Sequence, residues 1–99
     1  MLKCILLDGI FHALSDPTRR FILEVLCDGE TSAGELAEPF PFELSTILWH
    51  LKVLEQNGLV HTEKLGQVRR CRIDPQGLRL LDEWVVQRRK ALDPRPRRL

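Results

Sequence analysis

The 99-residue sequence contains no pair of closely spaced cysteines. Its three cysteines, Cys4, Cys27 and Cys71, are far apart and odd in number. A disulfide framework needs an even set, and a zinc ribbon needs pairs of the Cys-x-x-Cys kind. The sequence therefore predicts neither, and each cysteine is expected to pack as a small apolar residue.

The sequence also lacks the signatures of enzymes and of membrane insertion. It has no phosphate-binding glycine loop, no nucleophile elbow and no paired carboxylates with a plausible cleft. The apolar segment 1–14 is interrupted by Lys3, Asp8 and His12. It is too short to span a bilayer and has no small-residue cleavage site. We therefore expect a cytoplasmic protein that is not an enzyme and has no membrane partner.

The chain has room for one domain only. With 99 residues, of which 43% are hydrophobic and 29% charged, its composition is that of a globular domain. A domain this small buries only about two-thirds of its chain surface, so a second subunit covering apolar surface would stabilise it. We expect the domain to occupy residues 1–92 and residues 93–99, rich in proline and arginine, to form a flexible basic tail.

Charge is distributed unevenly along the chain, although the net charge is only +1. Residues 1–62 contain four basic and nine acidic residues, a net charge of −5. Residues 63–99 contain eleven basic and five acidic residues, a net charge of +6. A basic segment of this kind hints at a surface that binds a polyanion.

Two helices are predicted in the first third of the chain. Apolar residues recur at helical spacing up to Leu14, so a first helix is expected to end there. Asp16 can then cap a second helix, and Pro17 suits its first turn. Gly29 marks its end. The apolar face of this second helix consists of Phe21, Ile22, Val25 and Leu26.

Two further helices, separated by a short turn, follow. Ser32 and Glu35 fit a capping box that begins the first of them, and Pro39 and Pro41 end it. The second is predicted over residues 45–57, with a glycine at position 58 as its stop. Its inward-facing residues are Ile47, Leu51 and Leu54. This arrangement is typical of a helix-turn-helix.

A β-hairpin and a last helix complete the pattern. Residues 59–65 and 68–73 alternate apolar and polar side chains around Gly66 and Gln67. Asp74 and Pro75 then begin a helix that reaches about Leu92. The predicted order is α-α-α-α-β-β-α, a mainly helical α+β fold with a small β-hairpin, which is a winged helix-turn-helix.

At this point the sequence resembles the ArsR/SmtB-type winged-helix repressors. The matching strings are Phe-His-Ala-Leu-Ser-Asp-Pro-Thr-Arg-Arg at 11–20, Gly-Glu-Leu-Ala-Glu at 34–38, His-Leu-Lys-Val-Leu-Glu at 50–55 and Gly-Leu-Val at 58–60. They place residues 11–85 in the family's order and spacing. The resemblance implies a homodimeric repressor, joined through its first and last helices, that binds an imperfect palindrome in a promoter. The string at 13–20 is most similar to an autorepressor subgroup that has no metal site.

In this fold the second helix of the motif enters the major groove of double-stranded DNA. The outward-facing candidates for DNA contact are Ser45, Thr46, Leu48, Trp49 and Lys52. Ser45 and Thr46 can hydrogen-bond a phosphate or a base edge, and Thr46 and Leu48 can contact a thymine methyl group. Lys52 is expected to reach a phosphate. His50 is expected to pack inside and brace the motif.

Leu48 and Trp49 depart from the family, which usually has a serine and then a polar or basic residue at these positions. Trp49 either contacts DNA, folds back onto the wing and core, or binds a protein partner. The helix over 43–57 has a net charge of −1, so the attraction to DNA must come from elsewhere. The basic candidates are Arg19 and Arg20 in the second helix and Lys64, Arg69, Arg70 and Arg72 in the hairpin. Alternation along the strand places Arg70 and Arg72 on one face and Arg69 on the other.

Dimerisation is expected to bury apolar stripes on the first and last helices and to place two recognition helices about 34 Å apart. The interface candidates are Leu6, Ile10, Leu78, Leu81, Trp84 and Val85. Metal sensors of the family carry Cys-x-Cys near the third helix, or histidine and carboxylate pairs in the last. Neither set is present, so we expect no metal and no cofactor. Two alternatives stay open: a metal- or redox-responsive repressor using Cys4 and Cys71, and a protein-interaction module using Leu48 and Trp49.

Overall fold

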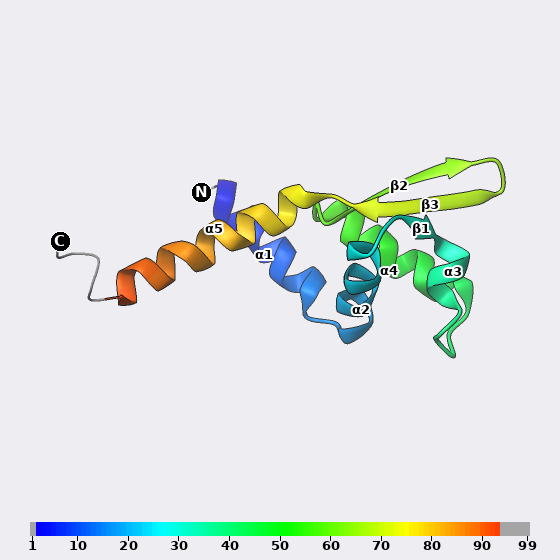
Figure 1. Ribbon diagram of the computed structural model, residues 1–99, viewed down its shortest axis with the longest axis horizontal. Helices are drawn as coiled ribbons and strands as arrows, with labels where there is room; N and C mark the ends of the chain where they lie inside the picture. Colours follow the sequence, from blue (N-terminus) through cyan, green and yellow to red (C-terminus); the bar gives the residue numbers. More distant parts are fainter. Residues whose placement is uncertain (1, 94–99) are drawn as a thin grey trace.

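The structure, a computed structural model, describes residues 2–93. Its elements are α1 (Leu2–Leu14), α2 (Pro17–Cys27), β1 (Thr31–Ser32), α3 (Ala33–Ala37), α4 (Leu44–Gln56), β2 (Val60–Leu65), β3 (Val68–Ile73) and α5 (Pro75–Leu92) (Figure 1). This is a winged helix-turn-helix, and the predicted fold is confirmed. The tail expected over 93–99 lies, from residue 94 on, outside the described residues. Within residues 2–93, no helix is both long and apolar enough to cross a membrane.

Local signals set the helix starts as predicted. Asp16 caps α2, because its carboxylate accepts a 3.1 Å hydrogen bond from the Arg19 backbone N–H. Ser32 and Glu35 form a complete capping box at the start of α3. The helix predicted over 45–57 begins and ends one residue earlier, at Leu44 and Gln56. Fraying at helix ends accounts for a difference of that size.

The core lies between α4 and the other helices. Ile47, Leu51 and Leu54 are 0%, 1% and 0% exposed, so the predicted inward face of α4 is confirmed. The expectation for Phe21 was wrong, because this side chain is 40% exposed. Its ring packs edge-on against Phe40 in the turn between α3 and α4, with centroids 5.4 Å apart. Phe21 therefore packs on this turn instead of within the core.

The sheet has three strands in the order β1-β3-β2, all antiparallel. The hairpin closes where predicted, with Leu65 opposite Val68 and Gly66 at a φ of 65°. Strand β1 was not predicted, since two residues are too few to display an alternating pattern. It pairs Thr31 with Cys71 and so joins the start of α3 to the central strand of the wing.

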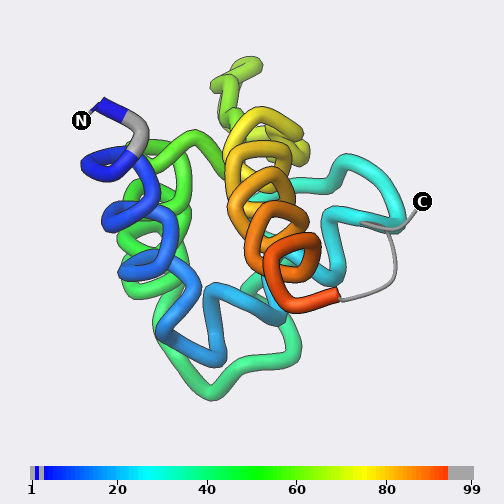
Figure 2. Tube along the Cα trace, turned by 90° about the vertical axis from the view of Figure 1, so that its left-hand side faces the viewer, coloured from blue at the N-terminus to red at the C-terminus, as the bar shows by residue number. Residues whose placement is uncertain are grey.

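The wing and the paired helices lie at opposite ends of an elongated molecule measuring 57 × 27 × 23 Å. Helix α5 extends away from the hairpin and lies along α1 (Figure 1). After a 90° turn, α1 and α5 both face the viewer, with the hairpin behind them (Figure 2). The start of α5 is fixed by a close backbone contact, because Gly77 N–H donates a 2.9 Å hydrogen bond to the Gly58 carbonyl. Helix α3 and the start of α4 lie at the end of the molecule away from α5 (Figure 1).

Candidate nucleic-acid interface

The second helix of the motif, α4, exposes the side chains that sequence reasoning assigned to its outer face. Ser45, Leu48, Trp49 and Lys52 are all exposed, and Thr46 is half-buried. Trp49 is the most open large apolar residue on this helix, at 57% exposure. A hydroxyl, two apolar side chains and one ammonium group therefore share one solvent-facing helix surface.

Arg19 was expected to contribute a free positive charge, and that expectation was wrong. Its side chain is only 4% exposed. Nε donates to the Ala13 carbonyl at 2.7 Å, and Nη2 donates to the His12 carbonyl at 3.2 Å. Burial and these hydrogen bonds leave the guanidinium inside the protein, out of reach of a phosphate.

His50 packs inside as predicted and is 7% exposed. Its Nδ1 lies 3.2 Å from Arg19 Nη1. A guanidinium can only donate, so Nδ1 must be the acceptor and the imidazole is neutral. Burial lowers the pKa of His50 and the Arg19 charge lowers it further, while Asp16 acts in the opposite direction. The neutral ring is therefore the form that this position favours.

Trp49 lies against the same guanidinium. The Arg19 Cζ atom lies 5.6 Å from the centroid of the indole, within cation–π range. The Trp49 and His50 rings are tilted against each other with centroids 5.0 Å apart. One face of the indole thus lies against Arg19 of α2, while more than half of the residue's surface stays open to solvent.

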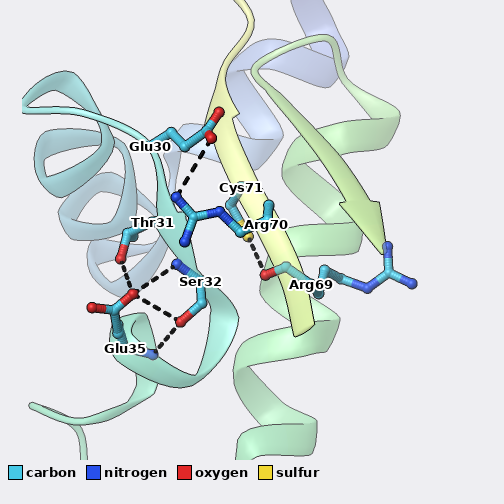
Figure 3. Close-up of polar contacts among 7 residues, drawn as sticks. All are labelled: Glu30, Thr31, Ser32, Glu35, Arg69, Arg70 and Cys71. Atoms are coloured by element: carbon cyan, nitrogen blue, oxygen red, sulfur yellow. Dashed lines mark hydrogen bonds and ion pairs between the residues drawn. The ribbon is translucent and has the colours of Figure 1, made fainter. Parts of the chain in front are cut away.

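The basic side chains of the wing point in different directions. Arg69 and Arg70 leave β3 on opposite sides, as the alternation predicts (Figure 3). Arg70 Nη2 lies 3.4 Å from Glu30 Oε1. Arg69 Nη1 donates a 3.0 Å hydrogen bond to Thr62 Oγ1, whose hydroxyl in turn donates to Glu55 on α4 at 2.9 Å. Both arginines are half-buried, and Lys64 and Arg72 are exposed.

Arg20, the other basic candidate on α2, is exposed, and its Nη1 donates a 2.7 Å hydrogen bond to the Leu14 carbonyl. Sequence reasoning did not identify Glu30, Glu55 or Thr62 as the partners that hold the wing arginines. No local pattern marks them, because each pair joins residues that only the sheet and α4 bring together.

A groove of about 400 Å³ runs between the start of α3, α4 and the wing. Its lining includes Leu44, Leu48, Lys64, Gln67 and Arg69. The groove brings the basic wing next to the apolar part of α4. It thereby gathers charge and apolar surface that are separate in the sequence.

The start of α3, next to this groove, is tied by a compact set of hydrogen bonds (Figure 3). Glu35 Oε1 accepts from Thr31 Oγ1 at 2.7 Å and from the Ser32 backbone N–H at 3.2 Å. These bonds, with that from Thr31 the largest influence, lower the pKa of Glu35. The carboxylate therefore holds β1 and α3 together in its charged form.

The cysteines are not gathered into a site. Cys71 is 1% exposed, and burial raises the pKa of its thiol to about 11. Cys4 and Cys27 are exposed on α1 and α2, so the expectation that every cysteine packs as an apolar residue was wrong for these two. In the described part of the chain, no three His, Cys, Asp or Glu side chains are grouped so that they could hold a metal ion.

The predicted interface residues fall into three groups. Leu6, Trp84 and Val85 are 43%, 40% and 37% exposed. Leu78 and Leu81 are half-buried against the core. Ile10 is 1% exposed within the single chain. It therefore belongs to the core and not, as expected, to an interface.

Comparison with known proteins gives consistent matches. A family model described as "Helix-turn-helix domain" matches residues 14–63. The transcriptional repressor SdpR of Bacillus subtilis is 39% identical over 61 residues, which cover 62% of this chain and 68% of that protein.

Two solved structures share the fold. The crystal structure of an ArsR family transcriptional regulator superposes with a TM-score of 0.86 at 37% identity, covering 91% of this chain and 93% of the other. A homodimeric winged helix-turn-helix DNA-binding domain from Mycobacterium bovis is 23% identical, with a TM-score of 0.69 and coverage of 89% and 83%. The second likeness concerns the fold alone.

Proposed function

Because this chain belongs to the ArsR family of transcriptional regulators, which is not a family of enzymes, we propose that it is a homodimeric repressor that binds a palindromic promoter operator without a metal ligand. The observation that carries the proposal is the exposed face of α4. Ser45, Leu48, Trp49 and Lys52 are open to solvent on the second helix of a helix-turn-helix, where a major groove would meet them.

This face is suited to reading base edges by shape and apolar contact. Ser45 supplies a hydroxyl, and Leu48 can contact a thymine methyl group. Trp49 offers a large, partly held aromatic surface, and Lys52 supplies one phosphate contact. We assign half-buried Thr46 to the edge of this set.

Affinity for the phosphate backbone comes mainly from the wing. Lys64 and Arg69 line the groove beside α4, and the neutral Thr62 hydroxyl holds Arg69 there without cancelling its charge, so both approach DNA together with Leu48. Arg70 is held by Glu30, so it is a secondary contributor, and Arg20 is left out of the phosphate contacts because its Nη1 donates to the Leu14 carbonyl. Arg19 is withdrawn from the phosphate contacts because it is buried.

The surface of α1 and α5 supports a homodimer. Leu6, Trp84 and Val85 are exposed on adjoining helices. An apolar hollow of about 400 Å³ lies between the two helices. It is lined by Cys4, Leu7, Leu80 and Trp84, together with Glu83, Gln87 and Arg88. Burying these side chains would stabilise a chain of this size. The Mycobacterium bovis domain with the same fold is homodimeric, and sedimentation velocity would test whether this protein is as well.

The chemistry of the thiols supports regulation without a metal. Buried Cys71 is mostly protonated at neutral pH, so it is a poor ligand and a poor nucleophile. Elemental analysis of protein purified without chelator tests this part of the proposal. Stoichiometric zinc or copper would contradict it.

A gel-shift titration with fragments of the protein's own promoter tests the proposed function. Two protomers should bind to one of the fragments. The affinity should fall steeply as the salt concentration rises, because phosphate contacts release counterions. Failure to bind any promoter fragment, even at low salt, would contradict the proposal. Exposed Leu48 and Trp49 would then be assigned to a protein partner instead.

A further inference from the structure

We propose that Arg19 is a positioning residue, which fixes the recognition helix α4 against the end of α1 instead of contacting DNA. The inference rests on the proposed function in one respect only, namely that α4 reads DNA. It gives a role to a buried cation that the DNA-binding surface does not use.

On one side, Arg19 contacts the end of α1. Its Nε and Nη2 atoms donate to the carbonyls of Ala13 and His12, at 2.7 and 3.2 Å. The His12 carbonyl also accepts from the Ser15 backbone N–H and hydroxyl, at 3.2 and 2.6 Å. Both His12 and Ala13 lie in the last turn of α1, where carbonyl groups need partners from outside the helix and the helix dipole is negative. A guanidinium satisfies both needs at once, since its N–H groups form a rigid fork and its charge is permanent.

On the other side, Arg19 contacts α4. The same guanidinium donates through Nη1 to His50 Nδ1 at 3.2 Å and lies 5.6 Å from the centre of the Trp49 ring. His50 and Trp49 are adjacent, so one contact reaches the inner side of α4 and the other reaches its outer side. A rotation of α4 about its axis would break at least one of them.

These contacts connect the core to the DNA-reading face. Trp49 is 57% exposed and Arg19 is 4% exposed, so the indole bridges solvent and interior. Specific base contacts require a helix held within a fraction of an ångström, because displaced donors and methyl groups no longer meet their partners. The fork of Arg19 restrains both the position of α4 and the orientation of the Trp49 ring.

Lysine cannot replace the fork. An ammonium keeps the charge but has a single nitrogen, which cannot reach two carbonyls and an imidazole from different directions. Arg20 is a matched control, because it is the next residue and its Nη1 donates to the Leu14 carbonyl at 2.7 Å. Among the described residues, no hydrogen bond joins Arg20 to α4.

The experiment compares Arg19→Lys with Arg20→Lys in a Trp84→Phe background, where Trp49 is the only fluorophore of its kind because the sequence has two tryptophans. Without DNA, Arg19→Lys should shift the Trp49 emission to the red and increase quenching by acrylamide. Arg20→Lys should leave both unchanged. Far-ultraviolet circular dichroism checks that each variant is folded.

With DNA, and with Trp84 retained because it lies on the proposed dimer surface, Arg19→Lys should weaken operator binding roughly tenfold, since hydrogen bonds to a charged group are at stake. Binding to unrelated DNA and the dependence of binding on salt should stay as in the parent, because the charge is kept and every phosphate contact remains. Arg20→Lys should change neither affinity by more than about twofold.

If Arg19→Lys is poorly folded, Arg19→Asn tests the same contact in its place. A folded Arg19→Lys also allows a test of coupling between Arg19 and His50. In a His50→Gln background, Arg19→Lys should cost much less operator affinity than in the parent, as expected for coupled residues. The emission in Arg19→Asn, which retains an uncharged donor, should also shift to the red.

The outcomes separate the two proposals. An unchanged Trp49 emission in folded Arg19→Lys, or an equal loss of operator and unrelated binding with a shallower salt dependence, overturns the positioning role. Absence of operator binding by the parent protein overturns the proposed function, while the emission shift without DNA still tests the Arg19 contact.

Discussion

Arg70 Nη2 and Glu30 Oε1 lie 3.4 Å apart, and this ion pair joins the central strand of the wing to the segment before β1. The Arg70 side chain is 35% exposed and the Glu30 side chain 48% exposed, so water screens the pair. An exposed pair of this kind contributes at most about 1 kcal/mol to stability. Its main effect is to hold an arginine that would otherwise be free to approach a phosphate.

Replacement of Glu30 by glutamine should therefore release Arg70 with little loss of stability. We expect the free energy of unfolding to change by less than about 1 kcal/mol. Operator affinity at low salt should rise a few-fold, because one negative charge is removed and one positive charge is freed. Fluorescence anisotropy at two salt concentrations measures this effect. Glu24→Gln on α2 makes the same change in charge away from the wing, and an equal rise there would contradict the explanation.

Truncation of Trp49 tests the apolar part of recognition. Trp49→Ala should cost about 1–3 kcal/mol of operator affinity while the domain stays folded. The expected cause is loss of the indole surface that projects from α4. Titration of labelled operator measures the loss. Unchanged affinity would remove Trp49 from the DNA contacts.

Neutralisation of Lys64 tests the electrostatic part. Lys64→Gln should weaken operator and unrelated DNA to a similar degree and reduce the slope of log affinity against log salt by about 1 for each phosphate that is no longer neutralised. Lys64 is exposed at the mouth of the groove beside α4, which is the reason to expect a phosphate contact. Lys90→Gln, near the end of α5, is the matched control and should leave the slope unchanged. A loss confined to operator DNA would indicate a base contact instead.

Gly77 on α5 packs too closely against its neighbours to be replaced by a larger residue without a loss of stability. A Cβ at position 77 would lie 2.6 Å from the Gly58 carbonyl oxygen, a backbone atom that cannot move alone. We expect Gly77→Ala to lower the free energy of unfolding by about 1–3 kcal/mol. Urea denaturation measures it. Gly34→Ala in α3 should instead raise the free energy of unfolding, because its Cβ would meet only Ser32 Oγ at 3.9 Å and alanine favours a helix. Destabilisation by both would refute the packing argument.

The three cysteines should differ in reactivity. Cys71 is buried with its pKa raised to about 11, so almost no thiolate is present at neutral pH. Cys4 and Cys27 are exposed. Iodoacetamide at pH 8 should modify Cys27 in the native protein and Cys71 only after unfolding in urea, while Cys4, which lines the proposed dimer surface, should react fully only when the dimer has dissociated. Mass spectrometry of digested protein reports each site. Rapid native modification of Cys71 would reopen its assignment as a sensor.

The sequence alone was sufficient for the local parts of the fold. Asp16 and Ser32 cap helices because their side chains bond to backbone N–H groups within three residues, and such bonds need no distant partner. The inward row of Ile47, Leu51 and Leu54 follows from helical spacing, and the turn at Gly66 follows from its backbone freedom. The exposed face of α4 could be predicted for the same reason.

Tertiary structure decided which charged and aromatic side chains remain on the surface. Arg19 and Arg20 are neighbours of the same type, yet the first is buried against α1 and α4 while the second is exposed. Their burial differs because Arg19 faces His50, which lies 31 residues away in the sequence. Phe21 packs against Phe40 and Arg70 pairs with Glu30, and both partners likewise come from other segments of the chain. Partners from distant segments meet only when the helices and the sheet pack, so periodicity and caps cannot reveal them.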